Sequence, residues 1–124
     1  MYKLRKAAVL VAALGSVGLL TSGAAHRCLA YWGPYSVSKA AVELMARIYA
    51  AETATTNLRV NVFNPGPIRT RMRASAMPGE DPMTLDTPEN CAEKIIDLCL
   101  PSYGETGTLY NYRVKKFLTW APPA

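Results

Sequence analysis

The spacing of apolar residues in the first half of the chain predicts two strands with a helix between them. Residues 17–21 form a short apolar run that ends in small residues, which is typical of a buried strand in a parallel sheet. A β-rich run at 58–63 stops at the turn signal Asn64-Pro65-Gly66-Pro67. Residues 35–53 predict a helix, because apolar residues recur there at helical spacing. These residues are Val37, Ala41, Leu44, Ile48 and Ala51.

The second half of the chain predicts a long loop, a helix and a third strand. Residues 69–86 carry charge, glycine, proline and methionine without a clear period, so we expect a loop that can include one helical turn. A helix then begins with Thr87 as its N-cap and Pro88 at its first position. Residues 105–113 predict a turn and a strand, whereas the tail at 113–124 predicts no element. The apolar face of this last helix comprises Ala92, Ile95, Ile96 and Cys99.

Strands that alternate with helices indicate an α/β fold built from parallel βαβ units with right-handed crossovers. We expect one domain over the 124 residues, with about three parallel strands and flanking helices. Three strands are few for such a sheet. One edge is therefore expected to stay bare unless another segment covers it.

The N-terminus permits two interpretations. A basic start, an apolar run at 7–20 and small residues at 21–25 resemble a secretory signal peptide. The apolar run is shorter than the roughly 20 residues that span a membrane, so we expect no membrane partner. In the competing interpretation, residues 3–14 are the end of a helix, Gly15 stops this helix, and a buried strand follows. We favour this interpretation because it fits the pattern of the residues that follow. A cytoplasmic protein is then expected, with a secreted basic binding protein as the alternative.

Charge and cysteine content narrow the possible partners. The formal net charge is +5, and the densest basic run, Arg69 to Arg73, contains no aromatic residue. We interpret this run as a solvated loop and expect no nucleic-acid partner. The three cysteines form no C-x-x-C pair, and the single histidine, His26, has no acidic or cysteine cluster beside it in the sequence. A disulfide framework or a metal site is therefore not expected.

A tyrosine and a lysine four positions apart, Tyr35 and Lys39, would lie on the same side of the predicted helix. The spacing alone is weak, because the pairs at 2/6 and 112/116 share it. Position distinguishes the middle pair. Ser22 lies 13 residues before Tyr35 at the end of one buried strand, and Pro65-Gly66 follows the next strand. Ligands in open α/β sheets bind at the carboxyl ends of strands, so these residues predict a site.

These residues, in this order, resemble the short-chain dehydrogenase/reductase family. The resemblance covers roughly residues 15–112 and rests on Ser22, the Tyr35-Ser36-Val37-Ser38-Lys39 motif, Asn61, and Pro65-Gly66-x-x-x-Thr70. It implies a Rossmann-type α/β fold, here a partial parallel sheet truncated at the N-terminus. It also implies NAD(P)-dependent oxidation or reduction of a small alcohol/carbonyl substrate.

The resemblance also implies roles for individual residues. Tyr35 would be the general acid/base, and Lys39, whose ammonium favours the phenolate, would also bind the nicotinamide ribose. Ser22 would donate a hydrogen bond to the substrate oxygen, where charge develops. The cofactor-binding residues would be Tyr35, Lys39, Pro65, Gly66, Ile68 (through its backbone) and Thr70.

Other parts of the family pattern are missing from this sequence. It contains no glycine-rich G-x-x-x-G-x-G phosphate loop and no residue that would choose between NAD and NADP. We therefore expect the chain to be the C-terminal half of such an enzyme, which alone binds dinucleotide weakly and turns over little. The resemblance also implies that the helix at 35–53 is a subunit-packing surface, so we expect a homo-oligomer. A non-catalytic interaction fragment with an idle motif remains an alternative.

Overall fold

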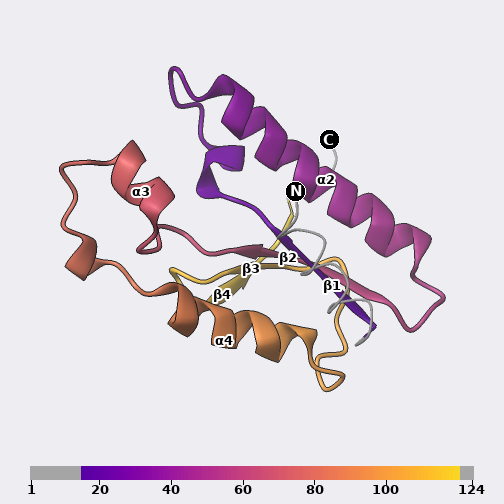
Figure 1. The fold of residues 1–124 in the computed structure, drawn as a ribbon. Coiled ribbons are helices and arrows are strands. Elements are labelled where there is room, and N and C mark those ends of the chain that lie inside the picture. The colour runs from indigo at the N-terminus through magenta and orange to yellow at the C-terminus, as the bar shows by residue number, and fades with distance from the viewer. Residues whose placement is uncertain (1–14, 121–124) are drawn as a thin grey trace.

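A computed structural model describes residues 15–120 of the chain (Figure 1). Its first three strands and the helices between them follow the order that the sequence pattern predicts. The helix expected over 3–14 and the signal-like start therefore lie outside the described residues. The elements are β1 (Ser16–Leu20), η1 (Gly23–His26), α2 (Gly33–Glu52), β2 (Arg59–Asn64), α3 (Arg71–Ala76), η2 (Pro82–Thr84), α4 (Pro88–Cys99), β3 (Leu109–Asn111) and β4 (Lys116–Leu118).

The strands form one sheet in the order β1-β2-β3-β4. β1 pairs with β2 and β2 with β3 in parallel, so the predicted parallel α/β unit is confirmed. Helix α2 covers one face of this sheet and α4 covers the other (Figure 1). Because β1 and β2 are parallel, the segments that follow them leave the sheet at the same end, where the strands have their carboxyl termini.

β4 is a fourth strand in the tail, where the sequence pattern predicted no element. It pairs antiparallel with β3, with Tyr110 opposite Phe117 and ring centroids 5.0 Å apart. The turn that joins the two strands places Lys115 at a φ of 54°, in the left-handed region. Only three residues form each strand, which is too short for a period of two to be recognised in the sequence.

Strand β2 is buried on both faces and divides the core into two clusters. Val60 and Val62 pack toward α2, against Ala46 and Ala50. Phe63 points the other way, toward α4, because successive side chains of a strand alternate between faces. The burial extends to two polar residues of this strand, since Asn61 is 6% and Asn64 is 4% exposed.

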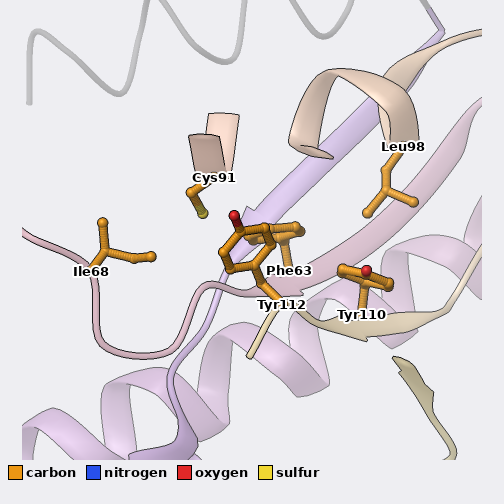
Figure 2. Close-up of a cluster of buried hydrophobic side chains, with 6 residues drawn as sticks. All are labelled: Phe63, Ile68, Cys91, Leu98, Tyr110 and Tyr112. Carbon is orange, nitrogen blue, oxygen red and sulfur yellow. The ribbon is translucent and has the colours of Figure 1, made fainter. Parts of the chain in front are cut away.

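The cluster on the α4 side includes residues from four separate segments (Figure 2). Figure 2 shows Ile68, which follows β2, pointing toward this cluster from the loop. The ring of Phe63 lies 5.7 Å from that of Tyr110 and 5.9 Å from that of Tyr112, between centroids. This packing therefore ties the segment after β2 to the end of β3. The members are Phe63, Ile68, Cys91, Leu98, Tyr110 and Tyr112.

Helix α2 faces the sheet with two alanines and one glutamate. Its buried positions are Glu43, Ala46 and Ala50. The five apolar positions whose spacing predicted the helix lie on its exposed side instead. Alanine lets the helix approach the sheet closely, so the larger apolar residues remain outside. No helix within residues 15–120 is long and apolar enough to cross a membrane.

Helix α4 begins as predicted, but its buried face differs from the expected one. The hydroxyl of Thr87 accepts a hydrogen bond from the Asn90 amide at 3.3 Å, as an N-cap does. The buried residues are Cys91, Leu98 and Cys99. Ala92 and Ile96 of the expected face are exposed, because a helix covering a sheet of few strands meets it along a narrow stripe.

Candidate active site

Lys39 joins the start of α2 to the end of β1. Its Nζ atom donates a hydrogen bond to the Leu20 carbonyl at 3.2 Å and lies 5.8 Å from the ring centroid of Tyr35. The predicted pair therefore lies on one side of the helix, next to the strand end that carries Ser22. The Tyr35 ring is also in edge contact with Trp32, with centroids 5.9 Å apart.

Ser22 is the N-cap of the short η1 turn. Its side-chain oxygen accepts a hydrogen bond from the Ala24 amide at 3.2 Å, and the residue is half-buried. A hydroxyl that accepts through its oxygen still has its hydrogen to donate. The cap thus orients the Ser22 side chain and leaves its donor for a ligand.

The turn after β2 requires glycine at one position. Gly66 has a φ of 68°, which disfavours other residues, and its amide donates to the Asn64 side-chain oxygen at 3.0 Å. A Cβ atom at this position would lie only 3.3 Å from Cβ of Arg113. Since Leu20 is in register with Phe63, the turn at Pro65 leaves the sheet on the same edge as Ser22.

Ile68 and Thr70 follow this turn and can present different polar groups to a ligand. The Ile68 side chain is buried in the α4-side cluster, so only its backbone can present polar atoms to a ligand. Thr70 is the N-cap of α3, and its hydroxyl oxygen accepts from the Arg73 amide at 3.1 Å. As with Ser22, the cap leaves the hydroxyl hydrogen to donate.

Asp86 closes the base of the loop that follows Ile68. Its carbonyl accepts from the Arg69 amide at 2.9 Å, and its carboxylate accepts from the Tyr112 hydroxyl at 2.7 Å and the Asn90 side-chain amide at 2.8 Å. The Asn90 and Tyr112 hydrogen bonds hold the pKa of the Asp86 carboxyl below its usual value. The same carboxylate, aided by burial, raises the pKa of Tyr112 to about 12.

The loop predicted at 69–86 is ordered by its own arginines. Arg73 makes two hydrogen bonds to the Glu80 carboxylate, at 2.6 and 2.8 Å. Arg69 donates to the carbonyls of Pro82 and Leu85, at 2.9 and 3.0 Å. The loop contains two short helices, α3 and η2, and Figure 1 shows α3 on the side of the sheet where α2 starts. The basic run thus supplies internal contacts.

Two residues near Ser22 were not among the predicted site residues. The buried Glu43 carboxylate accepts a hydrogen bond from the Thr21 hydroxyl at 2.6 Å and lies 2.9 Å from Nε2 of His26. The His26 side chain is half-exposed and pairs with this carboxylate. The only signal in the sequence is a glutamate one helical turn beyond Lys39. The sequence does not show that this glutamate is buried.

The other tyrosine and lysine pairs do not share these surroundings. Tyr112 is buried against Asp86 and the core, and Lys116 lies in β4, so that pair is not on a helix. The pair at 2/6 lies outside the described residues. Asn61, part of the family resemblance, bonds with its side chain to Thr108 and the Glu105 carbonyl. It therefore holds β2 to the segment before β3.

Within residues 15–120, no cluster of three or more His, Cys, Asp or Glu side chains could hold a metal ion. Cys91 and Cys99 are buried free thiols, and Cys28 is exposed. Burial raises the pKa of both the Cys91 and the Cys99 thiols, which disfavours the reactive thiolate.

The fold is that of an α/β protein whose predicted site residues lie at the carboxyl ends of its parallel strands, and known proteins share this fold. A family model described as Enoyl-(Acyl carrier protein) reductase matches residues 1–93. The chain is 47% identical over 74 residues to the uncharacterized oxidoreductase YciK of Escherichia coli (strain K12), covering 60% of this chain and 29% of that protein.

Two further relatives agree. NADPH-dependent aldehyde reductase 2, a chloroplastic protein of Arabidopsis thaliana, is 38% identical over 66 residues, covering 53% of this chain and 24% of that protein. A short chain dehydrogenase of Shigella flexneri 2a strain 301, solved with NADP, superposes with a TM-score of 0.73 at 38% identity, covering 79% of this chain and 41% of that one. The chain belongs to the short-chain dehydrogenase/reductase family of oxidoreductases. It spans less than half the length of each of these relatives.

Proposed function

We propose that this chain carries the proton-transfer residues of an NAD(P)-dependent oxidoreductase that interconverts an alcohol and a carbonyl compound. Tyr35 is the general acid/base, Lys39 assists it, and Ser22 binds the substrate oxygen. The main support for this proposal is the position of the Lys39 ammonium. It lies 5.8 Å from the Tyr35 ring centroid and donates a hydrogen bond to the Leu20 carbonyl, at the end of the strand before Ser22. Family membership supports this assignment.

The chemistry follows from these positions. When a carbonyl is reduced, negative charge develops on its oxygen, and the Ser22 hydroxyl can donate a hydrogen bond to it. The Tyr35 hydroxyl then delivers a proton to that oxygen. The ammonium of Lys39 favours the resulting phenolate by its positive charge, and in the oxidative direction the phenolate takes the proton back.

A nicotinamide cofactor, when bound, supplies or accepts the hydride in this reaction. The donors of this chain suit its polar groups. An ammonium has three N–H donors and one of those of Lys39 goes to Leu20, so within the described residues two remain for ribose hydroxyls. We propose that the backbone of Pro65, Gly66 and Ile68 and the hydroxyl of Thr70 hold the nicotinamide end. The proposal covers NAD and NADP alike.

The test compares two tyrosines of one helix. Tyr35→Phe removes the proton donor and is expected to lower kcat by about 100-fold or more in an aldehyde reduction followed by the absorbance of the reduced nicotinamide. Tyr49→Phe, on the same helix, removes an equivalent hydroxyl away from Lys39 and should leave kcat unchanged. Equal kcat in both variants would contradict the proposal and favour an interaction protein with an idle motif.

We also propose that α2 packs against a second copy of the chain. The apolar side chains of Val37, Leu44 and Ile48 are each more than half exposed on this helix. Substituting Leu44→Glu should lower the mass measured by light scattering if this face holds a homo-oligomer. We propose a cytoplasmic location as well, and N-terminal sequencing of the mature protein would detect a cleaved leader.

A further inference from the structure

A buried carboxylate joins α2 to both ends of the turn that carries Ser22. Glu43 is only 5% exposed, and Thr21, whose hydroxyl donates to it at 2.6 Å, is 3% exposed. On the other side, Nε2 of His26 lies 2.9 and 3.0 Å from the two carboxylate oxygens of Glu43. Thr21 and His26 directly flank the segment that runs from Ser22 to Ala25.

A carboxylate in this position needs a reason, because burying a charge without partners is costly. Here both oxygens are satisfied, and both partners come from one short segment on the neighbouring element. Glu43 is also one helical turn beyond Lys39, which is one turn beyond Tyr35, so the three lie along one stripe of the helix. Lys39 in turn holds the Leu20 carbonyl, immediately before Thr21.

We propose that Glu43 is a positioning residue for the reaction. By holding Thr21 and His26, it sets the η1 turn, and with it the Ser22 hydroxyl, at a defined place relative to Tyr35 on the same helix. The backbone bonds of this segment do not reach α2. Those of Ala25 and Arg27 run back to Ser22 and Ala24 within the turn, and the Thr21 amide donates to the Phe63 carbonyl of β2 at 2.9 Å. The catalytic part of this inference rests on the proposed function, whereas the structural part does not.

The first experiment measures local opening without any assay of activity. Amide hydrogen exchange in the full chain is compared between the wild type and Thr21→Val. This variant keeps the side-chain shape but removes the hydroxyl that donates to Glu43. Exchange at Ala24, Ala25 and Arg27 is expected to become about tenfold faster, because Glu43 loses a buried hydrogen bond. Exchange at Val62, a core strand amide bonded to Thr108, should change much less.

Two variants serve as controls. Thr53→Val removes a hydroxyl that bonds to the Tyr49 carbonyl at the far end of α2, and should leave the η1 amides unchanged. Glu43→Gln keeps the shape and one acceptor oxygen for Thr21, and its NH2 group can donate to a neutral His26 ring, so it should stay close to the wild type, whereas Glu43→Ala should open the turn. Unchanged exchange at η1 in both Thr21→Val and Glu43→Ala would overturn the proposal, as would equal acceleration at η1 and Val62.

The second experiment asks whether the effect on turnover passes through Ser22. Thr21→Val should lower kcat about tenfold with little change in KM for the cofactor, and should have no further effect when Ser22→Ala is already present. Additive losses in the double variant would overturn the catalytic role. If the wild type itself shows little turnover, as expected for a chain without the glycine-rich phosphate loop, the exchange data alone decide whether Glu43 holds the turn.

Discussion

Two segments border the candidate site, and they are held in opposite ways. The turn at 21–27 is anchored by one buried carboxylate, Glu43, that belongs to the helix carrying Tyr35. The loop at 69–86 is anchored by groups near the surface, through the Arg73–Glu80 pair and through Asp86 at its base. The first segment is thus tied to the helix that carries Tyr35. The second is tied to itself and to the end of β3.

This difference has a physical consequence. A buried hydrogen bond to a carboxylate is costly to break, since the partner left behind is unsatisfied away from water. The side chains of the Arg73–Glu80 pair are 27% and 30% exposed, so this pair stabilises the protein less than a buried one and is weakened by salt. We therefore expect the turn that presents Ser22 to be rigid and the 69–86 loop to open more readily. A rigid reacting group beside an adaptable cover would suit a site that must admit a substrate.

The largest effect is expected from Glu43→Ala. It leaves Thr21 and His26 without their shared acceptor, and we expect a loss of about 2–3 kcal/mol in the free energy of unfolding. Urea denaturation followed by circular dichroism measures it. Glu93→Ala, on the exposed side of α4, is the matched control and should change this free energy by less than about 0.5 kcal/mol. Similar losses in both variants would remove the distinction between the two segments.

A smaller effect on stability, confined to alkaline pH, is expected when the bond between Tyr112 and Asp86 at the base of the loop is removed. Because the folded pKa of Tyr112 is raised to about 12, its bond to Asp86 stabilises the fold fully below the usual tyrosine pKa of about 10. This contribution is lost as the pH rises through about 12. Tyr112→Phe should remove the tyrosinate absorbance step near pH 12 and flatten the loss of stability above pH 10. An unchanged step would show that another tyrosine titrates there.

The smallest effect on global stability is expected from Glu80→Gln, which removes the charge that Arg73 pairs with. The unfolding midpoint should hardly move, whereas subtilisin should cleave faster within residues 71–84. High salt should speed cleavage of the wild type and have less effect on the variant, because it screens the same pair. A large shift of the midpoint would mean that the loop is as firmly integrated as the turn at 21–27.

Local patterns predicted most of the elements. Thr87 and Pro88 mark the start of α4 correctly, because caps depend only on residues within one turn. The strand ends at Ser22 and at Pro65-Gly66 were also predicted, because they follow from adjacent apolar runs. β4 was not predicted, since three residues are too few to show an alternation of apolar and polar positions. Its pairing with β3 forms only in the tertiary structure. Nor could the face of α2 be read correctly from apolar spacing, because alanines pack against the sheet.

The sequence by itself determined the order of strands and helices, the family, and the placement of Ser22, Tyr35 and Lys39 at strand and helix ends. All of these depend on neighbours along the chain. Only the tertiary structure decided that Glu43 is buried between Thr21 and His26, and that Asp86 joins Arg69 to Tyr112. These contacts link residues 17 to 26 positions apart. Charged side chains acquire such partners only when folding brings distant segments together, and nothing in the spacing of the residues records it.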